Sequence, residues 1–367
     1  MFFLLLLVIE VSCLLDCKRT FVPHRISASG NCVQRVPECD FACYVGNLYP
    51  QSLAICMTRH YVYDWFCQND GAYATPVKYQ KISRALKYEE IFCSDEKDCE
   101  LLKPFYNFET RHMLAPKYGI STCVIYKNFS TVFTSIICYL FDAIAYKKEV
   151  PDMMKDTYFN RRCQLHNEVH GFGIKKEFKS ERGNRWRNYV ILREPEERFV
   201  SAFVDKCIFA KKQPEAHYYE RVNPCYGCET NITCFIEKQY ESLRAIANGT
   251  KQSAHTVEDA HFAPQTWHCE MKEFFTDYTF LKYTPSKTSA LLDELFAEFE
   301  FFGVPRNITD DIRKQIIGRK TFHVTYDSDL PGKYRQEIRN SRYLREMLVK
   351  LYYFDYLYFH FPLPNLR

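Results

Sequence analysis

The sequence is poor in glycine and lacks several familiar patterns, and each absence excludes a class of protein. Its 367 residues include 12 glycines and no Gly-x-x-x-x-Gly-Lys loop, so the phosphate-binding loop of typical nucleotide kinases is missing. No low-complexity tract and no basic, aromatic-interleaved segment occurs, and a net charge of +4 is too small to indicate a nucleic-acid partner. The composition is that of a mostly folded protein with one large core or two modest ones.

Cysteine, in contrast, is frequent, and its spacing indicates disulfides. The chain has 17 cysteines without a tidy zinc arrangement. Cys225-Tyr-Gly-Cys228 could suggest zinc or a redox pair, but no second CxxC accompanies it. Disulfides formed in an oxidising compartment are therefore favoured.

The cysteine count also predicts a free thiol. Without Cys13 and Cys17, which lie in the N-terminal segment, an odd number of cysteines is left. Cys123, in a predicted strand, and Cys138, in a predicted helix, are expected to be buried as small apolar side chains.

The N-terminal segment is strongly apolar. Residues 2–15 are short for a spanning helix and typical of the apolar region of a signal peptide, although Glu10 interrupts them and no positive charge precedes them. Residues 1–17 are therefore expected to be a signal peptide or a signal anchor, and no later stretch is apolar enough to cross a membrane. Residues 18–110 are expected to form a cysteine-rich stem or cap, and residues 111–367 the main domain.

The most informative stretch is a strand, a polar loop and a helix in succession. Residues 122–126 are β-branched and aromatic, and residues 132–144 carry apolar side chains at helical spacing. Between them lie Lys127, Ser130 and Thr131. Backbone N–H groups at a helix start, a lysine and a hydroxyl can together bind an anion. A Ser/Thr cap on a core helix is the alternative interpretation.

A second strand is followed by another set of anion-binding residues. Residues 187–192 predict a strand that ends on Arg193, and Pro195 indicates the first turn of the next helix. An arginine at a strand end and Ser201 on that helix can hold one phosphate between them, through a charged fork and a hydroxyl.

These segments resemble the nucleotide-binding motifs of Golgi carbohydrate sulfotransferases, above all the chondroitin 4-O-sulfotransferase group and its nematode branch. Lys127-x-x-Ser130-Thr131 is similar to their loop for the 5′-phosphosulfate. Arg193-Glu-Pro-x-Glu-Arg198-x-x-Ser201-Ala-Phe is similar to their motif for the 3′-phosphate. A competing register of the first motif is Pro116-Lys117, but Ser121 and Thr122 lead into a strand there, not a helix.

A third segment extends the resemblance toward the C-terminus. Asp259-x-His261-Phe-x-Pro264 resembles a family segment that is followed by a cysteine, here Cys269. The apolar, tyrosine-rich residues 348–359 resemble the family's closing helix. The resemblance therefore runs from about residue 115 to the C-terminus.

The resemblance implies a fold and a reaction. We expect an α/β, P-loop-like sulfotransferase fold with a central parallel sheet, flanking helices and a cysteine-rich N-terminal cap. The expected reaction transfers a sulfuryl group from 3′-phosphoadenosine 5′-phosphosulfate (PAPS) to a glycan hydroxyl, with chondroitin-like glycosaminoglycan as the acceptor, and needs no metal. The family places such enzymes in the Golgi lumen, anchored by one N-terminal helix, and secretion of the chain is the other route.

The resemblance also assigns roles to residues. Lys127 is the catalytic cation, and Asn128, Ser130 and Thr131 complete the loop at the 5′-phosphate. The 3′-phosphate falls to Arg193 and Ser201. The general base is expected to be His261, ahead of His166 and His170, and a buried structural histidine is its alternative. Arg198 is expected to form a structural ion pair on its helix.

Two features of the sequence bear on the acceptor and on the secretory route. The basic residues between 175 and 187 are either a solvated face or a groove for an anionic glycan. Sequons at Asn231, Asn248 and Asn307 agree with a secretory route, whereas a glycan on the sequon at Asn128 would block the loop, so we predict that this sequon is unused.

Two alternatives stay open at this stage. A lumenal or secreted glycan-binding glycoprotein that kept the fold and lost catalysis would be favoured by an occluded loop or by a glycan on Asn128. A lumenal kinase is disfavoured, because the chain lacks both the glycine-rich loop and metal-binding acids.

Overall fold

The computed structural model describes residues 88, 90–94, 99–106, 108, 110–155, 161–163, 166–171, 186–212, 221–251, 256–319 and 329–366. The chain divides into two units; of the described residues, the first holds Tyr88 and Ala290–Glu298, and the second holds the rest, within Glu89–Ser289 and Phe299–Arg367. The expected signal segment and most of the expected cap lie outside the described residues. The sheet and the candidate site belong to the second unit.

The second unit is built on a mixed five-stranded sheet with the order β3-β1-β2-β4-β5. The strands are β1 (Arg111–Ala115), β2 (Ile120–Cys123), β3 (Glu168–His170), β4 (Arg187–Arg193) and β5 (Tyr278–Tyr283). β2, β4 and β5 run parallel, as predicted. β1 is antiparallel to both β2 and β3, so the expectation of a parallel sheet is wrong at this edge. The reason is the connection from β1 to β2, which is too short for the crossover that parallel strands need.

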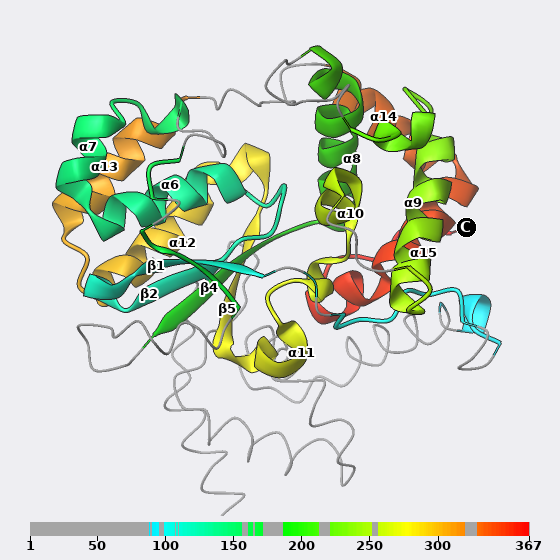
Figure 1. Ribbon diagram of the computed structural model, residues 1–367, viewed down its shortest axis with the longest axis horizontal. Coiled ribbons are helices and arrows are strands. Elements are labelled where there is room, and N and C mark those ends of the chain that lie inside the picture. The colour runs from blue at the N-terminus through cyan, green and yellow to red at the C-terminus, as the bar shows by residue number, and fades with distance from the viewer. Residues whose placement is uncertain are drawn as a thin grey trace, which may run out of the picture. The chain divides into compact units, whose positions relative to one another are not determined.

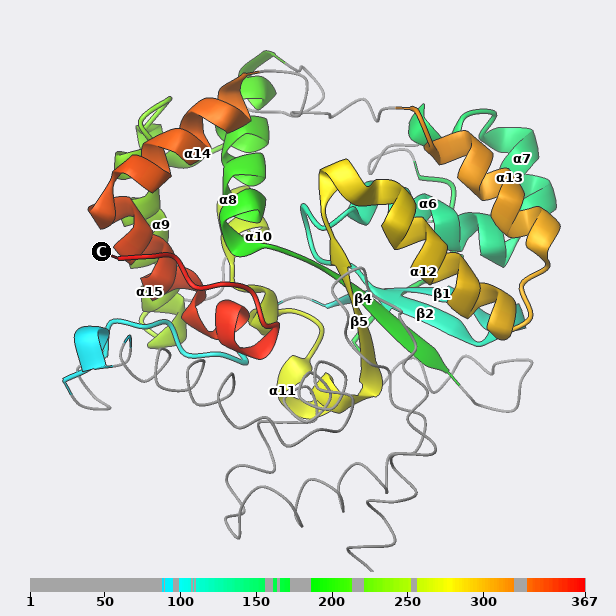
Figure 2. The same ribbon diagram turned by 180° about the vertical axis from the view of Figure 1, so that it is seen from behind.

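Helices flank this sheet in two groups, which Figure 1 and Figure 2 show from opposite sides. The first group holds α6 (Ser130–Phe141), α7 (Ala143–Glu149) and α13 (Arg306–Ile316). The second holds α8 (Pro195–Phe203), α9 (Ile232–Ala247), α10 (Val257–Phe262), α14 (Leu330–Asn340) and α15 (Arg342–Tyr358). The short helix α11 (Met271–Phe274) precedes β5, and α12 (Thr288–Phe301) follows it. Among the helices of these ranges, none combines the length and apolar character that a membrane span requires.

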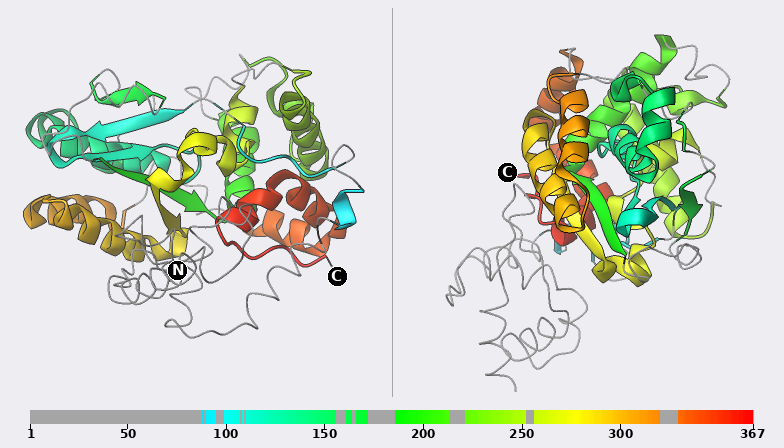
Figure 3. Two further views of the ribbon diagram at one scale, coloured as in Figure 1. Left: turned by 90° about the horizontal axis from the view of Figure 1, so that it is seen from below. Right: turned by 90° about the vertical axis from the view of Figure 1, so that its left-hand side faces the viewer.

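Each helix group has its own contacts. In the first, the Tyr139 hydroxyl on α6 donates to Asp311 on α13 at 2.5 Å, and Lys147 on α7 pairs with the same carboxylate at 2.7 Å. Figure 1 shows α13 beside α7, and Figure 3 shows the same elements from two further sides. In the second group, Phe199, Phe235 and other buried residues of α8, α9, α10, α14 and α15 form one apolar core.

Asp142 divides the predicted helix over residues 132–144 in two. Its backbone leaves the helical region, and its side chain accepts a hydrogen bond from the Ala145 N–H at 3.0 Å, which starts α7. The break changes the phase of the apolar stripe. Ile144, predicted to share the buried face, is 87% exposed.

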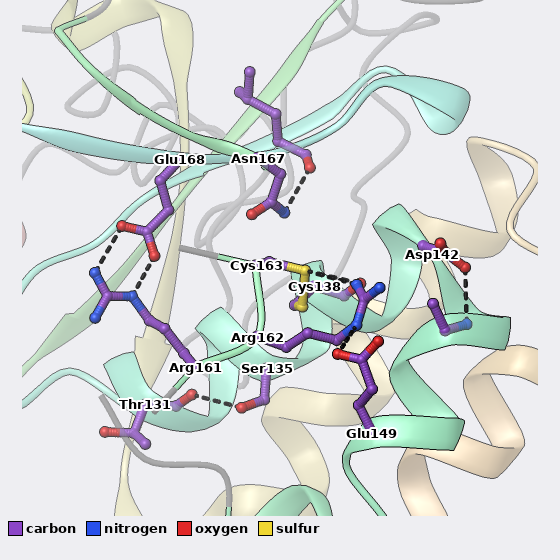
Figure 4. The surroundings of a disulfide bond; sticks show 12 residues. Thr131, Ser135, Cys138, Asp142, Glu149, Arg161, Arg162, Cys163, Asn167 and Glu168 are labelled. Atoms are coloured by element: carbon purple, nitrogen blue, oxygen red, sulfur yellow. Dashed lines mark hydrogen bonds and ion pairs between the residues drawn. A yellow bond between two sulfur atoms is a disulfide. The ribbon is translucent and has the colours of Figure 1, made fainter. Parts of the chain in front are cut away.

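The prediction that Cys123 and Cys138 are free apolar residues is wrong, because both form disulfides. Cys123 at the end of β2 bonds to Cys269, and Cys138 on α6 bonds to Cys163. Figure 4 shows the second bond with the Arg162–Glu149 ion pair beside it. Every cysteine in the described ranges is paired, including the predicted disulfide cysteines Cys225, bonded to Cys207, and Cys228, bonded to Cys234. The sequence could not show this, because partners that are distant in the chain meet only in the fold.

The disulfides are expected to differ in their contribution to stability. The Cys123–Cys269 bond spans a sequence separation of 146 residues, and Cys228–Cys234 spans 6. In the chain-entropy model, the long ring stabilises the fold by about 5 kcal/mol and the short ring by about 2.5 kcal/mol. Replacing each pair by alanines and measuring denaturant unfolding tests this, and equal losses from the two pairs would contradict it.

Candidate active site

The candidate site lies where the carboxyl ends of the parallel strands meet. Lys127 follows β2, Arg193 ends β4 and Tyr283 ends β5. The Arg193 Nη1 donates to the carbonyl oxygen of Lys127 at 3.2 Å, and its guanidinium carbon lies 5.6 Å from the centre of the Tyr283 ring. The two predicted cations are therefore brought together at the edge where open α/β sheets bind their ligands.

The start of α6 faces this edge without a side-chain cap. Phe129 occupies the cap position in the left-handed region, with φ 62°, and it makes no side-chain capping bond. In the part of the chain that the structure describes, the Ser130 and Thr131 hydroxyls have no hydrogen-bond partner. The first turn also contains no acidic residue. Its N–H groups and hydroxyls can therefore serve an anion.

The structure favours Lys127 over Lys117 as the lysine of this site. Lys117 is exposed in a 3₁₀ turn, Pro116–Tyr118, that precedes β2 and so lies at its amino end. Lys127 follows the carboxyl end of β2, and its side chain is only 14% exposed.

Asn128 holds the loop in place with a buried side chain. It is 1% exposed, and its Nδ2 donates to the Ile191 carbonyl at 2.8 Å and to Gln265 Oε1 at 2.6 Å. A glycan on Nδ2 has no room and would break these bonds, which supports the prediction of an unused sequon. The predicted contact of Asn128 with an anion would have to come from the backbone.

Gln265 is a positioning residue that the sequence did not reveal. Besides Asn128, its Oε1 accepts from the Arg193 N–H at 3.0 Å, and its Nε2 donates to the Arg193 carbonyl at 2.9 Å. The backbone N–H groups of Gln265 and Thr266 donate to the two oxygens of Asp355, at 2.7 and 2.9 Å. Asp355 is fully buried on α15. A lone acid within an apolar helix was the available signal, since a buried carboxylate needs such donors.

Arg198 is structural, as predicted, but its partners differ from those expected. It is buried on α8, where its Nε donates to the Tyr126 carbonyl at 3.1 Å and its Nη1 to the Ala263 carbonyl at 2.8 Å. Arg198 thus joins the loop after β2 to the segment after α10 through carbonyl groups, and the expected ion pair on its own helix is wrong.

A buried ion-pair cluster surrounds Lys127. Its Nζ and that of Lys206 each lie 2.9 Å from Oδ2 of Asp205. Asp205 and Lys206 belong to a π-helical turn, Val204–Ile208, that continues α8, and such turns are frequent at functional sites. Burial raises the pKa of the Asp205 carboxyl, but the two ammonium groups outweigh it and hold this pKa well below its usual range. Burial lowers the pKa of Lys127, and Asp205 opposes this shift.

His261 has the tautomer of a proton acceptor. Its Nδ1 lies 2.7 Å from the Val257 carbonyl oxygen, which can only accept, so Nδ1 carries the proton. Nε2, which keeps its lone pair, has no partner among the described residues. Burial, followed by the charges of Lys206 and Lys127, lowers the pKa of His261 well below 6.5, and the ring is neutral at pH 7.

His261 also stacks on Tyr126, in the loop that leads to Lys127, with the two ring centres 4.5 Å apart. The competing candidates His166 and His170 are exposed near the antiparallel edge of the sheet. The structure therefore joins His261 to the loop of Lys127.

Ser201 is placed on the expected helix. It is buried on α8, and its hydroxyl bonds to none of the described residues. The structure records no direct contact between Ser201 and Arg193, so their shared grip on a phosphate stays a prediction. Within the same ranges, no three His, Cys, Asp or Glu side chains are grouped so that they could hold a metal ion.

The fold is that of a mixed α/β protein, and comparison with known proteins shows its family. Residues 110–362 match the model of the sulfotransferase family, and the chain belongs to this family. It is 33% identical over 263 residues to carbohydrate sulfotransferase chst-1 of Caenorhabditis elegans, which covers 71% of this chain and 78% of that protein. It is 32% identical over 277 residues to protein C18B2.2 of the same organism, which covers 75% of each. No solved structure matches the chain.

We predict that the stability of the fold depends strongly on Gln265. Gln265→Leu leaves the Arg193 N–H and one Asn128 donor unpaired in the interior, and we expect a loss of about 2–4 kcal/mol in the free energy of unfolding. Denaturant unfolding measures this loss. Gln336→Leu is the matched control, because the Gln336 amide bonds to Asn340 on an exposed surface. An equally small effect of both substitutions would contradict the role of Gln265.

Proposed function

We propose that this protein transfers a sulfuryl group from PAPS to a hydroxyl of a glycan, with a chondroitin-like glycosaminoglycan as the acceptor. The observation that carries the proposal is the meeting of Lys127, Arg193 and the uncapped start of α6 at one edge of the sheet. The family supports sulfuryl transfer, and the name of the relative chst-1 supports a carbohydrate acceptor.

The residues at this edge suit the donor. The N–H groups of the first turn of α6, with Ser130 and Thr131, would hold the 5′-phosphosulfate in a P-loop-like manner. Arg193 and Ser201 would hold the 3′-phosphate, the group that separates PAPS from ATP-like nucleotides. The hydroxyls of Ser130, Thr131 and Ser201 have no hydrogen-bond partner among the described residues, which agrees with this fit.

Two groups of the protein, Lys127 and His261, would carry the reaction. The acceptor oxygen forms a bond to sulfur as the bond from sulfur to the bridging oxygen breaks, and adenosine 3′,5′-bisphosphate leaves. The Lys127 ammonium would offset the negative charge that grows on the bridging oxygen, and a donor of this kind lowers the barrier by a few kcal/mol. His261 Nε2 would accept the proton of the acceptor hydroxyl. Because the lysine supplies the charge, we propose a reaction without a metal.

The proposed cellular compartment rests on the cysteines and the sequons, and not on the proposed reaction. All described cysteines are paired, which suits an oxidising lumen, and the sequon residues Asn231, Asn248 and Asn307 are exposed. We propose the Golgi lumen, with the chain anchored by its N-terminal segment or secreted.

Binding of adenosine 3′,5′-bisphosphate tests the donor site. We expect calorimetry on the full chain, produced in a secretory host, to show binding that Arg193→Ala weakens by about ten- to a hundredfold, since a charge-assisted fork is lost. Arg339→Ala is the control, because Arg339 pairs with Glu196 and its side chain is 63% exposed. Wild-type protein that is folded and does not bind would refute the proposal and leave a glycan-binding protein.

The pH dependence of sulfotransfer tests His261. A base must be unprotonated, and the lowered pKa keeps His261 so at pH 7. We expect kcat/KM of the wild type to hold as the pH falls through 6.5 and to decline only well below it. His261→Gln should lower kcat by about 10²–10⁴-fold. His166→Gln, at an exposed histidine, should have no effect, and a large loss there would reassign the base.

A further inference from the structure

The Asp205 carboxylate has no part in the proposed reaction, yet it is the group closest to the proposed catalytic lysine. Its side chain is 4% exposed, and its Oδ2 lies 2.9 Å from the ammonium groups of both Lys127 and Lys206. A carboxylate buried in this way normally exists to pair cations. In the proposed reaction, one of these two cations, Lys127, is also needed by the anionic donor.

We propose that Asp205 is a latch on Lys127, which holds the lysine in an ion pair that the anionic donor must displace. The proposal rests on the proposed function, because it takes the 5′-phosphosulfate as the competitor. Asp205 thus acts through Lys127 and touches no substrate, so it is a positioning residue.

The geometry gives the latch two opposed effects. Asp205 lets Lys127 and Lys206 lie close together despite their like charges, and it fixes the position of the Lys127 ammonium group. The same carboxylate repels an incoming phosphate and competes for the ammonium. Removing it should therefore favour binding of the anion while it disorders the lysine that must meet the bridging oxygen. A residue that only stabilised the fold would weaken both binding and turnover.

Other charged groups around the cluster do not replace Asp205. The groups that act on His261 are Lys206, Lys127 and Asp205, with the Val257 carbonyl on its own helix. Arg193 adds a further positive charge near Lys127. Asp205 is thus the one carboxylate among the groups that the described structure brings to bear on both Lys127 and His261.

The test compares nucleotide affinity with turnover in Asp205→Asn. Calorimetry with adenosine 3′,5′-bisphosphate should show about tenfold tighter binding, which corresponds to about 1.4 kcal/mol, and kcat should fall by about tenfold or more. Asp152→Asn is the matched control, because that carboxylate also pairs with two basic side chains, Lys155 and Arg319, away from the cluster. The control should change neither quantity.

A second variant removes the risk that two unpaired lysines prevent folding. Asp205→Asn with Lys206→Met takes away one negative and one positive charge, so the net charge of the cluster is unchanged. The latch predicts that this double variant still binds the bisphosphate several-fold more tightly than the wild type, because nothing holds Lys127. Equal or weaker binding by the double variant would overturn the latch. A wild type that fails to bind would instead overturn the proposed function, so the two failures are distinguishable.

Discussion

The candidate site depends on one set of buried hydrogen bonds, centred on the side chain of Gln265. This amide fixes the loop after β2 through Asn128 and the end of β4 through both backbone groups of Arg193. Asp355 in turn fixes Gln265 from α15. Each bond satisfies a group that would otherwise be unpaired in the interior, so any other arrangement of these residues would cost folding free energy. Neutral amide side chains thus fix the backbone that carries Lys127 and Arg193, which lie far apart in the chain.

The sheet brings together the chain segments that these hydrogen bonds hold in position. Parallel pairing of β2, β4 and β5 brings three chain segments to one edge, and the helices that follow β2 and β4 start there. The two helix starts differ in their capping. At α8, the Glu194 side chain accepts from the Glu197 N–H at 2.7 Å and thereby caps the helix. At α6 no side chain does so, and its first N–H groups stay available for an anion.

Local pattern was sufficient for much of the fold and for the main candidates. Strand β4, helix α8 and the loop with Lys127 follow from periodicity, from Pro195 and from the polar break, because those signals lie within a few residues. Local pattern could not predict the disulfide between Cys123 and Cys269 or the antiparallel edge of the sheet. Nor could it predict the contacts of Gln265 and Asp205. Each depends on which distant segments meet, and one sequence carries no record of that. Ile144 shows the same limit at short range, since a single capping aspartate shifted the phase of the helix.

The disulfide between Cys123 and Cys269 has a topological consequence. The covalent ring that it closes contains Lys127, Ser130, Thr131, Arg193, Ser201, Asp205, His261 and Gln265. Because a ribosome releases the chain from its N-terminus, this ring cannot form until Cys269 has emerged, and Asp355 emerges later still. The hydrogen bonds of the site are thus complete only after Asp355 has emerged. A chain interrupted between Gln265 and Cys269 would hold all of these side chains and would lack the bond that encloses them.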